Sequence, residues 1–284
     1  MGGEIVTRAF YPLPLFPTVS VTGTRCMLMC PYCRGTLLRG MPSADTPMAL
    51  DRLLTALESS GALGVQLSGG FTAQGRLPLE GMLGVVGAHS GRLYVIAHDF
   101  LVDREEAARM RAAGIRRVDF PLTLNPEVLG VRGLKASPRI VEESFEALLD
   151  KGPSPVPHVL VGELAGKPSG EEDAIRYAAE LGVDLVVIIV FTPLPGTPWA
   201  GAAPPTSSRV MEILRIARKL LPGEVALGCM RPREVREKVD VEAVEEGLVD
   251  RIVAPSPRIR RLERYAACCS VDSASLPMFR LPVE

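Results

Sequence analysis

The feature that most constrains the fold is the alternation of short apolar segments with longer amphipathic segments along the chain. Strand-like and helix-like segments that alternate in this way are typical of a parallel sheet with crossover helices. The longest apolar run, residues 185–191, is far too short to cross a bilayer, so we expect it to be a buried strand. The pattern predicts an α/β protein that does not span a membrane.

Eight strand–helix units can be placed on the 284 residues, which fits a single TIM-type (β/α)8 barrel. We expect strands at 18–22, 64–67, 93–97, 117–120, 157–161, 184–191, 224–227 and 251–254. We expect helices at 47–60, 79–88, 103–113, 137–150, 169–181, 207–221 and 241–247, and Ser169 with Glu172 has the pattern of a capping box. The alternative is a partial (β/α)6 barrel with a C-terminal extension. In both cases we expect one domain over residues 1–284, with 255–284 as the extension.

The composition excludes several classes of protein. Hydrophobic residues make up 47% of the chain, which is enough for a large core, and the formal net charge of -1 argues against a nucleic-acid-binding protein with a broad basic surface. We see no basic segment followed by an apolar one that would indicate a secretory signal. We therefore expect a cytoplasmic, reducing location, which is compatible with reactive thiolates.

Three of the six cysteines, Cys26, Cys30 and Cys33, follow the first expected strand with the spacing C-x3-C-x2-C. Thiolates this close on one loop can converge on a soft metal centre. Three cysteines without a nearby fourth ligand would leave one iron of a [4Fe-4S] cluster open to bind another molecule. The residues expected to shield such a cluster from water are Met27, Leu28, Met29 and Tyr32.

Zinc binding, disulfide formation and core packing account less well for these three cysteines. A structural zinc site normally needs four Cys or His ligands, and the nearest histidine, His89, is far along the chain. A disulfide framework is expected in short secreted chains. Three cysteines within eight positions also make a poor pattern for an apolar core. We therefore favour an iron–sulfur cluster.

This loop resembles the cluster loop of the radical S-adenosylmethionine (SAM) superfamily, C-x3-C-x-φ-C with φ aromatic, and it matches at each defined position. The resemblance implies that Cys26, Cys30 and Cys33 are the catalytic cluster ligands. It also implies that the open iron chelates the amino and carboxylate groups of SAM. An electron from the cluster would then cleave SAM to a 5′-deoxyadenosyl radical.

Further matches to biotin synthases and their relatives extend from residue 18 to about residue 200. Ser68-Gly69-Gly70 follows the second strand, where the superfamily usually carries Gly-Gly-Glu, although Phe71 here replaces the acid. The resemblance implies that Asp119 and Thr123 hold the ribose and methionine parts of SAM, with Asn125 as a further candidate. The complete set of implied SAM-binding residues is Tyr32, Ser68, Gly69, Gly70, Asp119, Thr123, Lys135 for the carboxylate, and Val161 beside adenine.

The other cysteines are Cys229, at the end of the seventh expected strand, and the adjacent Cys268 and Cys269, beyond the eighth. We expect the eighth strand to close onto the first, so that all three reach the mouth of the barrel. Adjacent cysteines do not readily form a disulfide with each other. We predict an auxiliary [4Fe-4S] cluster here, and the alternative is that the three are incidental. Candidates for its fourth ligand are Arg231, Arg233, Ser270 and Ser273.

This second set of cysteines separates related families. Biotin synthases carry their second cluster on cysteines of inner strands, and none occurs in 93–97 or 157–161. The C-x4-C-x5-C motif and the R-S-x-S-S ending of single-chain lipoyl synthases are also missing. Residues 227–232 and 268–270 most closely resemble a subunit, the smaller one, of the two-component archaeal-type lipoyl synthase. The resemblance implies sulfur insertion into protein-bound octanoyl-lysine, with the auxiliary cluster as the sacrificial sulfur donor.

Two other functions stay open. One is a different radical SAM reaction, such as that of a biotin-synthase-like enzyme, a mutase, a methylase or a cofactor maturase. The other is an iron–sulfur electron-transfer or scaffold subunit. The expected partners are a sister radical SAM subunit, a lipoyl carrier protein and a low-potential electron donor, but neither nucleic acid nor a membrane. A run of arginines could dock an acidic carrier, or could simply be a solvated face: Arg258, Arg260, Arg261 and Arg264.

Overall fold

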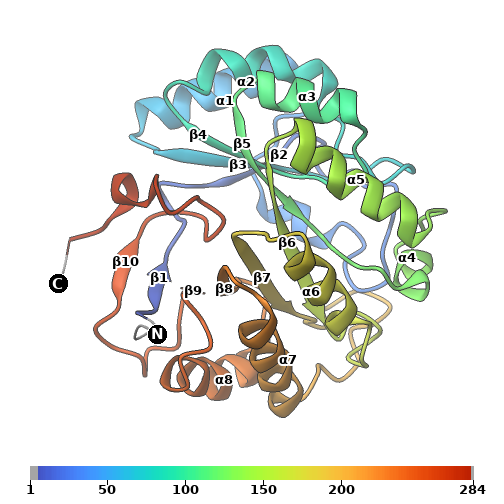
Figure 1. Ribbon diagram of the computed structural model, residues 1–284. Helices are drawn as coiled ribbons and strands as arrows, with labels where there is room; N and C mark the ends of the chain where they lie inside the picture. Colours follow the sequence, from blue (N-terminus) through green and yellow to red (C-terminus); the bar gives the residue numbers. More distant parts are fainter. Residues whose placement is uncertain (1–5, 283–284) are drawn as a thin grey trace. The chain divides into compact units, whose positions relative to one another are not determined.

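The computed structural model describes residues 6–282, and Figure 1 shows its helices and strands. Residues 12–155 form one compact unit, and residues 6–11 with 156–282 form another. Each unit contains a parallel sheet with helices that connect its strands. None of the helices in the described residues is both long and apolar enough to span a membrane.

The sheet of unit 12–155 consists of parallel strands in the order β2-β3-β4-β5. Their bounds are β2 Thr18–Ser20, β3 Gly64–Ser68, β4 Tyr94–His98 and β5 Ile115–Phe120. The strands form here because Val65, Leu67 and Ile96 are fully buried and apolar, as expected for a sheet that is covered by helices.

The helices of this unit are α1 (Pro47–Ser59), α2 (Leu83–His89), α3 (Arg104–Ala112), α4 (Pro126–Val131) and α5 (Pro138–Lys151), with short 3-10 turns η1 (Thr36–Gly40) and η2 (Glu80–Met82). Figure 1 shows α1, α2, α3 and α5 along one face of the sheet. The starts of α1 and α3 follow from side-chain caps, since Thr46 accepts from the Ala49 amide and Asp103 from the Glu106 amide.

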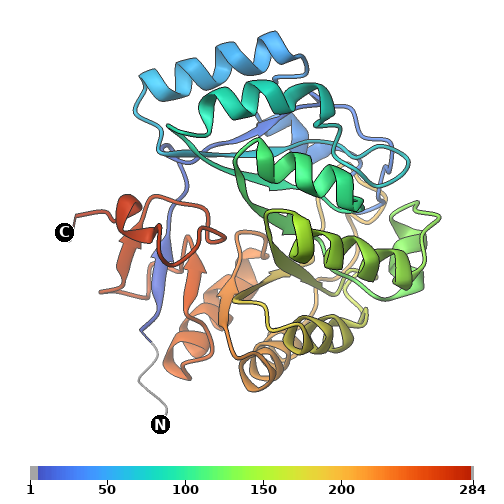
Figure 2. The same cartoon turned by 45° about the horizontal axis from the view of Figure 1, so that its top comes forward.

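The second unit has parallel strands in the order β6-β7-β8-β9-β1-β10. Their bounds are β1 Arg8–Phe10, β6 Ser154–Val161 (most of which lies in this unit), β7 Leu185–Val190, β8 Glu224–Leu227, β9 Arg251–Val253 and β10 Glu263–Tyr265. The helices are α6 (Glu171–Glu180), α7 (Ser207–Leu220), α8 (Arg233–Glu245) and the 3-10 turn η3 (Leu276–Phe279). In Figure 2, β10, β1 and β9 run side by side, in agreement with their pairing.

The structure corrects several expected elements. The strand at 251–253 pairs with β8 and with β1, so the expectation that it closes onto the strand at residue 18 was wrong. The short strand β1 takes this position because Phe10 stacks on Tyr265 of β10 at 5.5 Å. Helix α8 begins at Arg233 rather than 241, because Val235 and Val239 place two buried side chains on one helical face.

The expected capping box of α6 was also wrong. Gly170, with φ 85°, is the N-cap residue, and the Ser169 hydroxyl instead donates to Oε1 of Glu171 at 2.9 Å. Glu172 pairs with Arg209 at 2.6 Å and so is not available to close a box.

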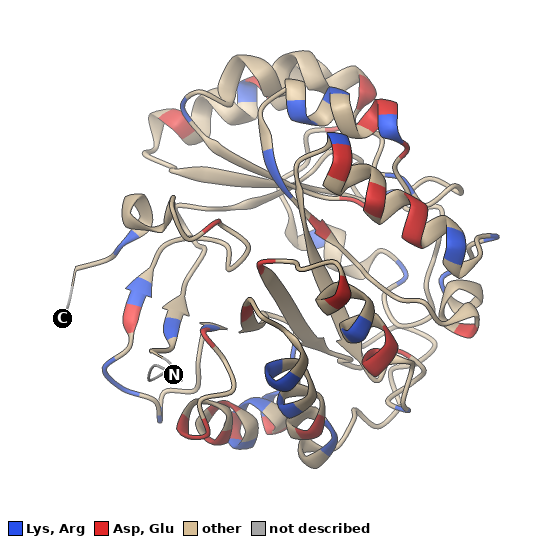
Figure 3. Cartoon of the chain, viewed as in Figure 1, with Lys and Arg blue, Asp and Glu red and all other residues tan. Residues whose placement is uncertain are grey.

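Charged residues lie mainly on the helices, while the strands of both units are largely uncharged (Figure 3). This is the distribution expected when the helices shield the sheets from water. The few charges within strands are therefore informative, and two of them, Arg251 of β9 and Glu224 of β8, form an ion pair with each other.

Candidate cofactor site

The loop that carries Cys26, Cys30 and Cys33 follows β2 directly and turns sharply. The Cys30 carbonyl accepts from the Cys33 amide at 3.0 Å and from the Arg34 amide at 2.9 Å. Met29 and Arg34 both have a φ of 50°, which lies in the left-handed region that non-glycine residues seldom adopt. Strain of this kind persists only where the surrounding structure holds it.

The loop after β3 holds the cysteine loop from one side. The Gly70 amide donates to the Thr22 hydroxyl at 2.7 Å, and the Met27 amide donates to the Phe71 carbonyl at 2.9 Å. A Cβ atom on Gly70 would lie 2.0 Å from the Arg25 carbonyl oxygen and 2.5 Å from Cα of Cys26. Only glycine fits here, so the structure brings the cysteine loop and the Ser68-Gly69-Gly70 segment together.

The turn between α4 and α5 holds the cysteine loop at a second point. The Cys30 thiol donates to the Arg132 carbonyl at 3.8 Å. Gly133, with φ 79°, approaches so closely that an added Cβ would lie 3.1 Å from the Leu28 carbonyl oxygen. Arg132 itself is buried and donates to the Pro121 carbonyl at 2.8 Å. The loop is therefore a supported element and not an isolated surface turn.

The expected shielding by apolar neighbours is correct only in part. Leu28 is 8% exposed, but Met27 is 68% and Met29 42% exposed. The three cysteines of the loop and Tyr32 are half-buried. Of these three apolar side chains, only Leu28 is therefore placed away from water.

The side chains of the loop are of the kind that holds an iron–sulfur cluster. In the described residues, no group of three or more His, Cys, Asp or Glu side chains is arranged to hold a metal ion. An iron–sulfur cluster is held by cysteine thiolates on separate irons, so its ligands need not converge on one point. Three cysteine thiols on a loop whose backbone packs against Gly70 fit such a group, and Cys26, Cys30 and Cys33 would hold it.

Polar side chains form hydrogen bonds across the sheet of this unit, and Ser68, His98 and Asp119 lie at or next to the carboxyl ends of their strands. Asp119, at the end of β5, is 1% exposed, and its Oδ2 accepts from Nε2 of Gln66 on β3 at 2.5 Å. Gln66 in turn accepts from the Thr18 hydroxyl of β2 at 2.8 Å. Oγ of Ser68 lies 3.4 Å from Nδ1 of His98 at the end of β4. Such strand ends carry the active sites of α/β barrels.

Phe71, which replaces the expected acid, has a defined role in packing. Its ring lies edge-on to the His98 ring, with 5.5 Å between the centroids. The position therefore orients a histidine at the strand ends instead of offering a carboxylate.

The remaining predicted SAM contacts occupy different surroundings. Thr123 is 5% exposed and accepts from the Asn125 amide at 3.3 Å, while Asn125 caps α4 by accepting from the Glu127 amide at 2.8 Å. Lys135 is exposed after α4. Val161, fully buried at the end of β6, belongs to the second unit and pairs with Val190.

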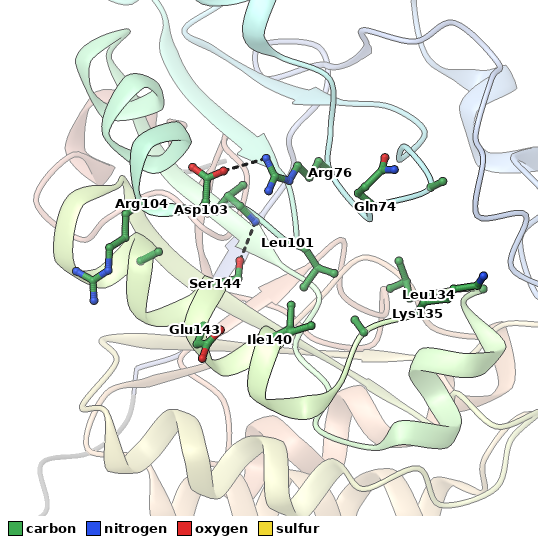
Figure 4. A pocket seen from close by; sticks show the side chains of 15 residues that line it. Gln74, Arg76, Leu101, Asp103, Arg104, Leu134, Lys135, Ile140, Glu143 and Ser144 are labelled. Carbon is green, nitrogen blue, oxygen red and sulfur yellow. Dashed lines mark hydrogen bonds and ion pairs between the residues drawn. The ribbon is translucent and has the colours of Figure 1, made fainter.

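Lys135 lines a cavity of about 740 Å³ within unit 12–155 (Figure 4). The N-terminus of α3 and the side of α5 form much of its wall, including Leu101, Asp103 and Ile140. None of the other predicted SAM-binding residues lines this cavity. The role of Lys135 in binding SAM stays a prediction.

The second set of cysteines lies in the second unit. Cys229 is exposed just after β8, Cys268 is half-buried, and Cys269 is 4% exposed beyond β10. Within the part of the chain that the structure describes, Cys229, Cys268 and Cys269 do not form a group arranged to hold a metal ion. A second cluster stays a prediction.

The candidates for the fourth ligand differ in their availability. Arg231 forms a buried ion pair with Asp240. Arg233 is exposed and forms an ion pair with Glu237. Ser273 accepts from Arg251 at 2.8 Å. Ser270 is fully buried, and its hydroxyl makes no hydrogen bond within residues 6–282. Ser270 is thus the candidate whose hydroxyl is still available.

Sequence reasoning missed three polar residues of the first site, Gln66, His98 and Thr22. The available signal was a polar residue inside or at the end of an otherwise buried strand, as in Gly64–Ser68. A polar group buried in such a strand needs a hydrogen-bond partner, and here the partners come from neighbouring strands.

Comparisons with known proteins show the fold. No protein-family model matches the sequence, and no curated protein matches it. Solved structures do match.

A crystal structure of HydG, a maturase of the [FeFe]-hydrogenase, has a TM-score of 0.63 at 14% sequence identity and covers 87% of this chain. HydG from Carboxydothermus hydrogenoformans has a TM-score of 0.61 at 17% sequence identity, and the match covers 91% of this chain and 63% of that one. Methylornithine synthase (PylB) has a TM-score of 0.59 at 14% sequence identity, and the match covers 93% of this chain and 77% of that one.

These neighbours are radical SAM enzymes, and this chain has their α/β fold of the TIM-type barrel class. The fold class predicted from the sequence is thus confirmed, and the partial-barrel alternative is also compatible with it. The chain spans 57% of the length of the first HydG structure. At these identities the likeness concerns the fold, and the activity is a separate question.

Proposed function

We propose that the chain is a radical SAM enzyme. The observation that supports this best is the cysteine loop at the end of β2, held against Gly70 in a fold that solved radical SAM enzymes share. Cys26, Cys30 and Cys33 would hold a [4Fe-4S] cluster, which supplies the electron for the reductive cleavage of SAM. Ordinary acid–base groups have little effect on an unactivated C–H bond, so a cofactor must supply the reactivity.

The chain's own residues would bind and orient SAM. Gly69 and Gly70 let the backbone of this segment lie directly against the cysteine loop, because a Cβ on Gly69 would meet Thr22 and one on Gly70 would meet Arg25. Ser68 and Asp119 supply polar groups at the neighbouring strand ends. Tyr32, half-buried in the loop, would limit the access of water to the cluster. Thr123, Lys135 and Val161 stay candidates with weaker support, because their surroundings do not link them to these groups.

The finer proposal is sulfur insertion into a protein-bound octanoyl chain, as one component of a lipoyl synthase. It is supported by Cys229, Cys268 and Cys269, which would hold an auxiliary sulfur-donating cluster with Ser270 as the available fourth group. Its partners would be a sister radical SAM subunit, a lipoyl carrier and a low-potential electron donor. Arg258, Arg260 and Arg261 are exposed between β9 and β10 and would attract an acidic carrier, whereas Arg264 lies over the Tyr11 ring at 5.2 Å.

A second candidate is a different radical SAM reaction that uses one cluster. It is favoured by the exposed position of Cys229 and by the fold likeness to a maturase and to methylornithine synthase. The general fold and the first cysteine loop suit both candidates equally. The second set of cysteines separates them.

Anaerobic iron and sulfide analysis tests both proposals. We compare the wild type with two variants, Cys26/Cys30/Cys33→Ala and Cys229/Cys268/Cys269→Ala. If each set holds one cubane, each variant loses about four irons. SAM cleavage should be lost only in the first variant. A wild type that binds no iron in its first loop would contradict the radical SAM proposal.

The sulfur-insertion proposal needs its own assay. Octanoyl-lysyl peptide is incubated with the chain, its sister subunit, SAM and a reductant without oxygen, and lipoyl product is measured by mass spectrometry. Product from the wild type, and none from the second variant, is expected. SAM cleavage without any thiolated product would leave the radical SAM proposal standing and would reject lipoyl synthesis.

A further inference from the structure

The cavity of about 740 Å³ in unit 12–155, which Figure 4 shows, is lined largely by apolar side chains. Leu101, Val102 and Leu134 are buried, and Ile140 of α5 adds an apolar side chain that is 44% exposed. Leu101 and Val102 follow shortly after the carboxyl end of β4. Apolar pockets of this size with a few polar groups, next to the carboxyl ends of parallel strands, are typical ligand sites of α/β proteins.

The walls of the cavity are held to one another. The Leu101 amide donates to the Gly75 carbonyl at 3.1 Å, and a Cβ on Gly75 would lie only 2.9 Å from the Leu134 side chain. The Ser144 hydroxyl of α5 accepts from the Val102 amide at 2.8 Å. These contacts fix the shape of the cavity, so a ligand would not have to order its walls on binding.

Four of the five charged side chains that line the cavity are neutralised by ion pairs. The five are Arg76, Asp103, Arg104, Lys135 and Glu143. Arg76 and Asp103 neutralise each other at 3.0 Å, and Figure 4 marks this pair. Arg104 pairs with Asp150. Glu143 pairs with Arg139 at 3.0 Å.

Lys135 is the exception. It is exposed after α4 and forms no ion pair within residues 6–282. In Figure 4 it lies at the opposite end of the cavity from Arg104 and next to Leu134. The cavity thus offers one uncompensated positive charge beside apolar surface. A ligand that matches this arrangement has an apolar body and one negative group that accepts from the ammonium.

We propose that this cavity binds a small amphipathic carboxylate, with its carboxylate on Lys135 and its apolar body against Leu101 and Ile140. A carboxylate fits better than a phosphate ester, because one lysine balances a charge of about −1 but not the roughly −2 of a phosphate. The N-terminus of α3 adds no second anion site, since the Asp103 side chain already caps it. This inference goes beyond the proposed function and depends on neither set of cysteines.

The test measures the binding of octanoate to the full chain at pH 7 by isothermal titration calorimetry. Octanoate combines an apolar body with a carboxylate, whereas acetate lacks the body and octylamine carries the opposite charge. Octanoate should bind at one site. Acetate and octylamine should bind at least about tenfold more weakly, because each lacks either the burial of the apolar body or the charge-assisted hydrogen bond.

Two variants and two matched controls locate the site. Lys135→Met should weaken octanoate binding about tenfold, and Ile140→Gln should weaken it severalfold. Lys151→Met is the control for the first variant, because Lys151 is also an exposed lysine of this unit and does not line the cavity. Leu149→Gln is the control for the second, because Leu149 is 42% exposed on the same helix, outside the cavity. Both controls should bind octanoate as the wild type does.

SAM also carries a carboxylate, and Lys135 is a predicted contact for it, so the two ligands must be separated. Saturating SAM should leave octanoate binding unchanged. If SAM displaces octanoate, the cavity belongs to the cofactor and the proposal is overturned. It is also overturned if the wild type does not bind octanoate saturably, if acetate or octylamine binds as well as octanoate, or if Lys135→Met and Ile140→Gln bind octanoate no more weakly than their controls.

Discussion

Arg231 and Asp240 form a two-bond ion pair in the interior of the second unit, with Nε to Oδ1 at 2.8 Å and Nη2 to Oδ2 at 2.9 Å. The two side chains are 1% and 0% exposed. Arg231 also donates to the carbonyls of Gly228 and Val253, and Asp240 accepts from the Ser256 amide at 2.8 Å. The pair therefore joins the ends of β8 and β9 to α8, and it fixes the residue before Cys229.

Removal of one partner of this pair should be strongly destabilising. Asp240→Ala leaves a buried guanidinium without a counter-charge, and we expect a loss of about 3–5 kcal/mol in the free energy of unfolding. The measurement is urea unfolding followed by circular dichroism. As a control, Glu246→Ala breaks an exposed pair with Arg215 and should cost far less, because water and salt screen exposed ion pairs. If both variants lose the same free energy of unfolding, burial does not determine how much the Arg231–Asp240 pair contributes to stability.

Asp99 predicts an unusual dependence of stability on pH. It is fully buried, its Oδ1 accepts from the amides of Leu77 and Phe100, and its Oδ2 has no hydrogen-bond partner within residues 6–282. Burial raises the pKa of Asp99 to about 8. Between pH 4 and pH 8 the folded state therefore holds a proton that the unfolded state has lost, so this group makes stability fall as pH rises.

Asp99→Asn keeps the amide contacts and removes the charge. Its free energy of unfolding should be similar to that of the wild type near pH 4 and clearly higher near pH 9, measured by urea unfolding across this range. Asp45→Asn, in an exposed ion pair with Arg25, serves as the control for the loss of a surface carboxylate. If Asp99→Asn is less stable than the wild type at pH 9, the carboxylate must be stabilised in a way that its surroundings do not indicate.

Glu171 should have the opposite effect at low pH. Burial would raise its pKa, but bonds from the Gly162 and Ser169 amides and from the Ser169 hydroxyl outweigh burial and hold the pKa below its usual value. The folded state thus binds this proton less readily, so its contribution is present above pH 4.5 and is lost as pH falls through the lower folded pKa. Glu171→Gln should be less stable at pH 7 and lose less stability below pH 4.5 in acid titrations followed by fluorescence. Glu212→Gln, on an exposed side chain that pairs with Arg209, is the control.

The fold was largely predictable because its strands follow simple patterns. The strand at 224–227 has the expected bounds, since its apolar residues are buried and turn residues flank it. The strand Arg8–Phe10 was not predictable, because three residues before a proline-rich stretch carry no local signal and pair with strands more than 200 residues away. Its formation depends on tertiary contacts such as Phe10 with Tyr265.

The candidate site was predictable only where residues of a characteristic type and spacing, such as the three cysteines, occur together in the sequence. The cysteine spacing located the first loop, but nothing local indicates that Gln66 links Thr18 to Asp119 across the sheet. Lys135 has a suitable charge and lines a cavity beside α5, and which residues line that cavity depends on how α4 and α5 pack. Burial of Cys269 and exposure of Cys229 are likewise outcomes of packing.

The close approach of Gly70 to the cysteine loop leads to a direct test of the site. Gly70→Ala would place a methyl group 2.0 Å from the Arg25 carbonyl oxygen and 2.5 Å from Cα of Cys26, both of which are backbone atoms that must move. We expect iron bound by the first loop to fall severalfold, while the far-ultraviolet circular dichroism stays close to that of the wild type, because overpacking at one loop costs about 1–3 kcal/mol. Gly84→Ala on α2, where an added Cβ meets nothing within 4 Å, is the matched control and should bind iron normally. Normal iron content in Gly70→Ala, measured in the Cys229/Cys268/Cys269→Ala background so that only the first loop contributes, would show that the cluster does not need the contact between these two loops.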